Sequence, residues 1–190
     1  MNAILYGSIL QLFVGALASY GTLPTGSGTV GELITALNTS GPIWMVKRSY
    51  NTSNHKCVYA KKVSLTGQDY EFQQYYLENG QWKQTHQYAN LSMINDQEHG
   101  EGAAMTVMNE KNATMGEVYV LVIWTPDEHC GILHSYHNAT GKYECEMYAW
   151  NETVRTNLSQ CHTNYGTYCT STSHQDNTVY NKDCTEYSGC

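Results

Sequence analysis

The stretch "KYECEMYAW", residues 142–150, reads as a β-strand that places two different sets of side chains on its two faces. One face carries acidic and aromatic groups, and the other carries sulfur and apolar groups. The first set is Glu144, Glu146, Tyr148 and Trp150, and the second is Tyr143, Cys145, Met147 and Ala149. Such a pattern is unusual for a sheet washed by solvent, so the function of this strand depends on which face is inside.

The chain around this stretch has the same period of two, with short turn clusters between the runs. It predicts an all-β protein of eight antiparallel strands, which can close into an up-and-down barrel around one small ligand. Strand counting leaves a two-sheet sandwich open as the alternative. Helical character at residues 30–40 and 152–168 favours a barrel flanked by helices. The predicted strands are 44–51, 56–65, 69–77, 82–93, 103–109, 117–125, 130–137 and 142–150.

The N-terminus predicts secretion. An apolar run from Ile4 to Ala18 ends in an A-x-A pattern, which is typical of a signal peptide, here residues 1–18. Residues 19–190 then have the length of a single domain, and no later segment is apolar and long enough to span a bilayer. The net charge of −7 predicts no basic surface for nucleic acid or anionic membrane. We therefore expect an extracellular protein with no nucleic-acid partner and no membrane insertion.

Seven cysteines and seven N-glycosylation sequons fit that compartment. No two cysteines form a C-x-x-C pair, so they predict disulfides rather than a metal site. The sequons predict a glycoprotein, because each acceptor must lie on a turn or an outward-facing surface. The acceptors are Asn38, Asn51, Asn90, Asn112, Asn138, Asn151 and Asn157.

Three motifs give the chain a resemblance to the salivary lipocalins of hard ticks, the family that includes the histamine-binding proteins. They are "WMVKRSYN" leading to Cys57, "GEVYVLVIW" leading to Cys130, and "YECEMY" followed by Cys161. Their order and spacing are more specific than any one motif, and the resemblance runs from about residue 30 to Cys184. It implies a lipocalin barrel with an N-terminal helix and a C-terminal helix packed outside, in a protein secreted into saliva.

The resemblance also implies disulfides, from the second strand to the C-terminus and from the seventh strand to the terminal helix. If Glu146 faces the lumen, Cys145 faces outward toward that helix, where Cys169 is the nearest unassigned thiol. Cys190 is left over and is either free or joined to a second chain, so the sequence leaves both a monomer and a homodimer open. The implied pairs are Cys57–Cys184, Cys130–Cys161 and Cys145–Cys169.

For the lumen, the resemblance implies carboxylates and aromatic rings that clamp a cationic amine. The positions that match this pocket are Tyr50, Tyr119, Glu146 and Tyr148. The other family carboxylates fall at about Ser53, Gln87 and Leu121, and the aromatics of strand five fall near Met105 and Val107. A single remaining carboxylate in an otherwise apolar barrel is a poor site for an ammonium group.

We therefore predict an apolar lumen with a few polar points, which suits a sterol, a fatty acid or an eicosanoid. Arg48 lies on the predicted inner face, where it could pair with Glu146 or receive a lipid carboxylate. Each of these positions is also explained by plain packing of a barrel core. The predicted ligand-binding residues are Trp44, Val46, Arg48, Tyr50, Gln87, Met105, Val107, Tyr119, Leu121, Ile123, Glu146, Tyr148 and Trp150.

The sequons, the extra cysteines and the lost carboxylates resemble the Japanin-like branch of this family, which carries cholesterol and modulates host dendritic cells. The resemblance thus implies a lipid-binding modulator of the host immune response. One alternative is a scavenger of histamine, serotonin or leukotrienes. Another is a protein that binds a host immune protein through its outer surface. No catalytic motif accompanies the paired glutamates of residues 142–150, so we expect no enzyme, no cofactor and no metal site.

Overall fold

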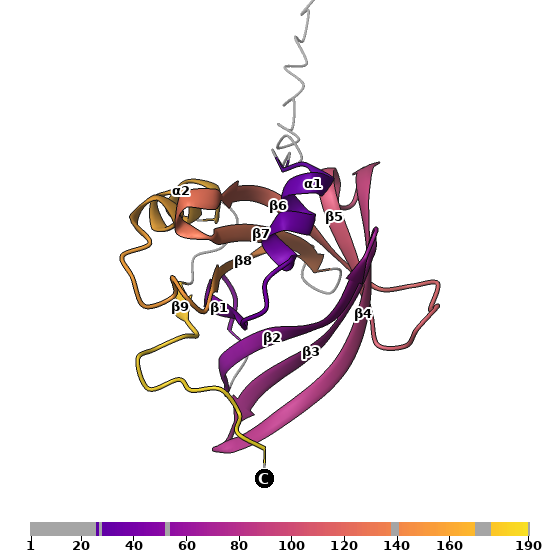
Figure 1. Ribbon diagram of the computed structural model, residues 1–190. Coiled ribbons are helices and arrows are strands. Elements are labelled where there is room, and N and C mark those ends of the chain that lie inside the picture. The colour runs from indigo at the N-terminus through magenta and orange to yellow at the C-terminus, as the bar shows by residue number, and fades with distance from the viewer. Residues whose placement is uncertain (1–25, 27, 52–53, 138–140, 170–175, 190) are drawn as a thin grey trace, which may run out of the picture.

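The computed structural model describes residues 26, 28–51, 54–137, 141–169 and 176–189, and these residues form an antiparallel barrel. Its strands are β1 (Ile43–Arg48), β2 (His55–Thr66), β3 (Asp69–Glu78), β4 (Gln81–Asp96), β5 (Gly100–Met108), β6 (Glu117–Thr125), β7 (Cys130–His137) and β8 (Lys142–Trp150). From β2 to β8 each strand bonds to the next, and Figure 1 shows them curving around a common axis. The predicted signal peptide and the predicted acceptor Asn138 lie outside the described residues.

The predicted eight-stranded up-and-down barrel is confirmed. The sheet closes on itself because β1 pairs with β8 on one side and with β2 on the other. That closure excludes the two-sheet sandwich. The predicted strands at 117–125, 130–137 and 142–150 coincide with β6, β7 and β8.

Local sequence explains the tight connection between β3 and β4. Asn79 and Gly80 both have a positive φ, of 51° and 78°. Two such residues form a type I′ turn, whose twist matches that of the strands it joins. The "NG" dipeptide therefore sets the register, in which Glu78 pairs with Gln81.

Two helices flank the barrel, as predicted. The helix α1 (Val30–Leu37) begins at a capping box, in which the Glu32 amide donates to Thr29 Oγ1 at 3.2 Å and the Thr29 amide donates to Glu32 Oε2 at 2.8 Å. It lies at the upper end of the barrel in Figure 1. The helix α2 (Ser159–Cys169) lies outside the barrel, beside β6, β7 and β8.

Three disulfides attach the part of the chain after β8 to the barrel. They are Cys57–Cys184 and Cys130–Cys161, which the family resemblance implies, and Cys145–Cys169, which was inferred from the outward face of residues 142–150. Two of them join strands β7 and β8 to α2. Cys145 reaches α2 because it points outward from β8, while its neighbour Glu146 points into the lumen.

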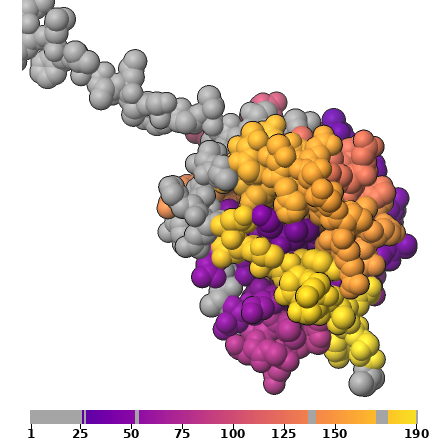
Figure 2. Space-filling model, turned by 90° about the vertical axis from the view of Figure 1, so that its left-hand side faces the viewer, coloured from indigo at the N-terminus to yellow at the C-terminus, as the bar shows by residue number. Residues whose placement is uncertain are grey.

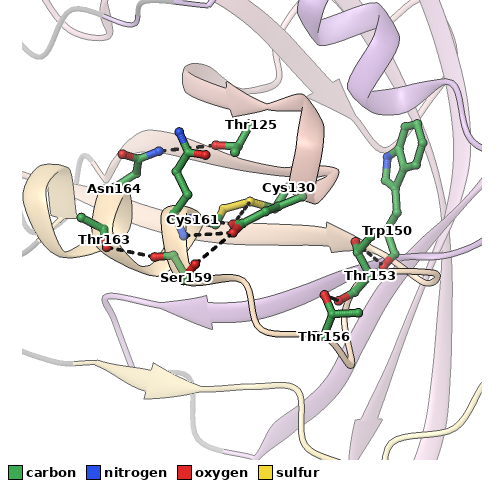
Figure 3. Close-up of a disulfide and its surroundings, with 11 residues drawn as sticks. Thr125, Cys130, Trp150, Thr153, Thr156, Ser159, Cys161, Thr163 and Asn164 are labelled. Carbon is green, nitrogen blue, oxygen red and sulfur yellow. Dashed lines mark hydrogen bonds between the residues drawn. A yellow bond between two sulfur atoms is a disulfide. The ribbon is translucent and has the colours of Figure 1, made fainter.

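Glu128 caps the start of α2 from the short turn η1 (Pro126–Glu128) between β6 and β7. Its Oε1 accepts the amide of Gln160 at 3.0 Å, and its Oε2 accepts the amide of Cys161 at 2.8 Å. A carboxylate in this place satisfies free amides and meets the positive end of the helix dipole. Figure 3 shows the start of α2 beside the Cys130–Cys161 disulfide.

Glu128→Ala should therefore lower the free energy of unfolding by about 1 kcal/mol, the usual cost of losing a helix cap. Urea denaturation followed by circular dichroism measures the change. Asp127→Ala is the matched control, because Asp127 is an exposed carboxylate on the same turn. Equal losses in the two variants would contradict the capping role.

The C-terminal segment completes the barrel wall between β1 and β2. Among the described residues, only Ile43 and Trp44 of β1 pair with β2, and further along β1 pairs with the short strand β9 (Asn177–Thr178). Val179 then bridges both strands, since its amide donates to the Val46 carbonyl at 3.0 Å and its carbonyl accepts the Cys57 amide at 3.1 Å. Figure 2 shows this segment lying across the face between α2 and strands β2 and β3.

Apolar side chains form one layer inside the barrel and another outside it. The inner layer joins α1 to the lumen side of the strands through Leu33, Leu91 and Leu121. The outer layer joins α2 to β7 and β8 through Ile132 and Met147. Because α2 shields the outer layer from water, both faces of β6, β7 and β8 are apolar over much of their length.

The described sequon acceptors are all exposed. They are Asn38, Asn51, Asn90, Asn112, Asn151 and Asn157. Glycosylation of these side chains stays a prediction. Neither helix in the described part of the chain has the length and apolarity needed to cross a membrane.

Candidate ligand-binding site

The barrel encloses a cavity of about 450 Å³, lined by residues of all eight barrel strands and of α1. That volume lies within the range of roughly 300–1,000 Å³ that is typical of small-molecule sites. At the end beneath α1 the wall is apolar and aromatic. Leu33 and Leu37 of α1 pack there on Ile43, and the indole of Trp150 donates to the carbonyl of Ala36 at 2.8 Å. The helix thus closes this end of the cavity.

Glu146 is the buried acidic centre of the cavity, with only 3% of its surface exposed. Its position on β8 directs the side chain inward, where its two oxygens accept hydrogen bonds from two tyrosines. Tyr50 donates to Oε1, and Tyr148 donates to Oε2 at 2.6 Å. The carboxylate that would be costly to bury alone is therefore hydrogen-bonded within the protein.

Burial raises the pKa of the Glu146 carboxyl above its ordinary value, while the hydrogen bonds from Tyr148 and Tyr50 act in the opposite direction. Among the charged neighbours, Glu117 raises this pKa and Arg48 lowers it. Burial also raises the pKa of the Tyr148 hydroxyl well above its ordinary value. Tyr148 therefore stays a neutral hydrogen-bond donor, and Glu146 is the group of this pair that gains or loses a proton.

Glu146→Gln should remove a pH-dependent loss of stability. A carboxyl whose pKa is raised by folding stabilises the folded state fully below its ordinary pKa, near 4.5, and this contribution is lost as the pH rises through the raised value. Glutamine does not titrate, so the stability of the variant relative to the wild type should increase between about pH 4 and pH 7. Urea denaturation across this range measures the difference.

The exposed Glu101→Gln on β5 is the matched control, because it makes the same substitution on the surface of the barrel. A difference between Glu146→Gln and the wild type that does not change with pH would contradict the raised pKa.

Arg48 is the cation beside this centre, and it is also buried, with 6% of its surface exposed. It pairs with Glu146 across the β1–β8 ladder, so both side chains enter the lumen at the same level. Its Nη2 donates to the His55 carbonyl at 3.1 Å, and its guanidinium carbon lies 5.3 Å from the centre of the Tyr50 ring. The centre of the cavity therefore contains one carboxylate and one guanidinium held among tyrosines.

Most of the residues predicted to bind a ligand line this cavity, although ligand binding by each of them stays a prediction. Those that line it are Arg48, Tyr50, Gln87, Met105, Val107, Tyr119, Leu121, Glu146, Tyr148 and Trp150.

Trp44 and Val46 do not line the cavity, which corrects the prediction for β1. Both belong to the outer apolar layer, where the Trp44 indole donates to Asn151 Oδ1 at 2.9 Å. The register of β1 against β8 shifts between Met45 and Lys47, which is a β-bulge. An extra residue reverses the alternation, so Met45 faces inward before the bulge and Arg48 faces inward after it.

Ile123 is the third predicted lining residue that does not line the cavity, and a β-bulge is again the cause. The register of β6 against β7 shifts between Leu121 and Ile123. Leu121 faces the lumen before the shift, whereas Ile123 packs against the outer layer and Trp124 takes the inner position. A strict period of two cannot locate such a bulge.

Several residues that line the cavity were not predicted from the sequence. For one group of them, the sequence pattern would have allowed the prediction. The strand β3 alternates along "DYEFQQYYL", and its inward residues are Tyr70, Phe72, Gln74 and Tyr76. Their aromatic period of two could have placed them on the inner face. Glu117 and His129 gave no such signal, because Glu117 begins β6 and His129 lies in the turn between η1 and β7.

The sequence profile described as "Tick histamine binding protein" matches residues 29–186, which is most of the chain. The chain belongs to the tick histamine-binding protein family. Members of this lipocalin family are binding proteins. The comparison with curated proteins found no match to this chain.

Several solved structures have a fold similar to that of this chain. Japanin from Rhipicephalus appendiculatus, bound to cholesterol, has a TM-score of 0.51 at 11% identity, over 76% of this chain and 95% of Japanin. AM182 in its serotonin complex has a TM-score of 0.57 at 14% identity, over 80% and 92% of the two chains. Insecticyanin from the tobacco hornworm Manduca sexta has a TM-score of 0.53 at 12% identity, over 88% of each chain.

Two positions at which the family resemblance implies a lumen carboxylate have uncharged side chains in this protein. Gln87 and Leu121, where the resemblance places carboxylates, both line the cavity. The third such position, Ser53, lies outside the described residues. Glu117 also lines the cavity and adds a second carboxylate from a different position.

Proposed function

We propose that this protein binds a small, mainly hydrophobic ligand in its barrel, such as a sterol or another lipid, and modulates the host immune response from saliva. The observation that carries the proposal is that the hydrogen-bonding groups around Glu146 already come from the protein itself. Its carboxylate is bonded by the Tyr50 and Tyr148 hydroxyls and has Arg48 as its cross-strand neighbour. An ammonium ligand would have to compete with these groups, whereas a neutral hydroxyl group can join them.

The rest of the cavity supports the same class of ligand. Between α1 and Glu146 its wall consists mostly of aliphatic and aromatic side chains, such as Phe72, Leu121 and Trp150. Apolar surface of this kind gives affinity for a ring system or an acyl chain, and the few polar groups give orientation. The resemblance to the Japanin-like branch extends the proposal to host dendritic cells.

The decisive experiment is native mass spectrometry of the secreted, deglycosylated protein, followed by extraction of any bound molecule. We expect a sterol or another lipid. Titration of the delipidated protein with cholesterol and with histamine then compares the two classes directly. Binding of histamine but not cholesterol would overturn the proposal. Comparing lipid-loaded and delipidated protein on cultured dendritic cells tests whether an immune effect depends on the ligand.

Amine binding is the second candidate, and Glu117 favours it. This carboxylate lines the cavity and raises the pKa of Glu146, so the two acidic groups act on each other. Arg48 offsets only one of the two negative charges, so a protonated amine near Glu117 would balance the other. If an amine binds, Glu117→Gln should lower the affinity for the amine and leave the affinity for cholesterol unchanged.

A further inference from the structure

Two buried polar atoms at the closed end of the cavity have no hydrogen-bond partner. One is the hydroxyl of Tyr70, a side chain that is only 3% exposed, and the other is Nδ1 of His129. Neither atom has a partner in the part of the chain that the structure describes. Both residues line the cavity. Leaving such groups buried and unpaired costs free energy, so each of them would be stabilised by a hydrogen-bond partner that enters the cavity.

Both groups are held in place at the end that α1 covers. The ring of Tyr70 stacks on Phe72 with 4.9 Å between ring centres, and it packs in the same cluster as Leu33 of α1. The ring of His129 stacks on Trp150 with 4.1 Å between centres. The His129 amide donates to the Pro126 carbonyl, and its carbonyl accepts the Trp150 amide. The two polar atoms are therefore positioned before any ligand arrives.

This end is separate from the centre around Glu146. Glu146 and Trp150 are four residues apart on β8, which corresponds to roughly 13 Å along the strand. Apolar side chains such as Phe72 and Trp124 line the cavity on the side of α1. The cavity thus has polar groups near both ends of an apolar stretch.

We propose that the closed end is a second polar contact for the ligand, made by Tyr70 and His129. The ligand class is then an amphiphile with an oxygen group at each end of an apolar body, such as a side-chain-hydroxylated sterol or a hydroxylated fatty acid. A hydroxyl group suits this end because it can both donate and accept, as can the Tyr70 hydroxyl, while a neutral imidazole nitrogen accepts. The inference rests on the proposed function, since it assumes a lipid in the barrel.

Two matched pairs of probes test the class of ligand. The first pair is cholesterol and its side-chain-hydroxylated derivative, and the second is palmitate and its ω-hydroxylated derivative. In each pair that binds, the doubly oxygenated member should bind roughly tenfold tighter or more, because only it reaches the unpaired groups. The pair with the higher affinity distinguishes a sterol from a fatty acyl ligand. Equal affinities within both pairs would overturn the inference, whereas no binding by any probe would refute the proposed function itself.

Tyr70→Phe removes only the oxygen and keeps the stacked ring. The variant should lose the preference for the doubly oxygenated probe, keep its affinity for the singly oxygenated one, and have an unchanged or higher Tm without ligand. Tyr165→Phe is the matched control, because its hydroxyl is also buried without a partner among the described residues but lies in the outer layer. It should leave the preference intact. A preference that survives Tyr70→Phe, or a lower Tm of the empty variant, would contradict the assignment.

Discussion

Replacing both Cys57 and Cys184 with serine should lower the free energy of unfolding by about 2–5 kcal/mol, the usual cost of removing a native disulfide from a small domain. The bond joins residues 127 apart in sequence, so it restricts the unfolded chain strongly. It also anchors the segment that fills the wall between β1 and β2, where Val179 bonds to both strands. Losing the bond therefore weakens the closure of the barrel as well.

Guanidinium denaturation of the double variant measures this loss. The matched control replaces Cys145 and Cys169, whose bond spans only 24 residues and should contribute less in the chain-entropy account. A control variant that loses more stability than the Cys57–Cys184 variant would contradict the importance of the C-terminal closure.

Arg48→Met should cost about 3 kcal/mol of folding free energy at neutral pH, because it leaves the buried Glu146 without its cationic neighbour. Methionine keeps the apolar stem of the side chain but removes the guanidinium. The loss should shrink as the pH falls, because Arg48 lowers the pKa of Glu146 and its removal favours the protonated, neutral carboxyl. Urea denaturation at several pH values measures both effects.

A double-mutant cycle isolates the interaction between the two charges. In the Arg48→Met/Glu146→Gln variant no buried charge is left unpaired at this level, so part of the lost stability should return. Additive losses in the two single variants would show that Arg48 stabilises the fold through contacts other than the one with Glu146.

The fold could be predicted from the sequence because most strands keep a clear period of two between turn residues. The β3–β4 hairpin is set by Asn79 and Gly80. The strand β8 alternates without interruption, which separated its two faces, and the family resemblance then placed Glu146 on the inner one. The N-terminal helix was also readable, from its apolar spacing. The predicted C-terminal helix began too early, because residues 151–156 form turns and α2 starts at Ser159.

The site could be predicted only where the alternation is unbroken. The bulges in β1 and β6 reverse the faces of Val46 and Ile123, and their positions depend on pairing with neighbouring strands rather than on local sequence. The pairing of β9 with β1 was missed for a similar reason. A strand of two residues has no period, and its place is decided by tertiary contacts and the Cys57–Cys184 bond.

The closing of the wall by residues 177–184 also sets an order for folding during synthesis. Translation delivers β1 and β2 early, but the segment that fills the gap between them leaves the ribosome only after β3 to β8 and α2. Until then, the edges of both strands carry unpaired amides and carbonyls, which are prone to pair with other chains. The thiol of Cys57 must also wait for Cys184 while nearer cysteines have already emerged. Maturation of this protein therefore depends on protecting the unpaired edges of β1 and β2 until residues 177–184 are synthesised.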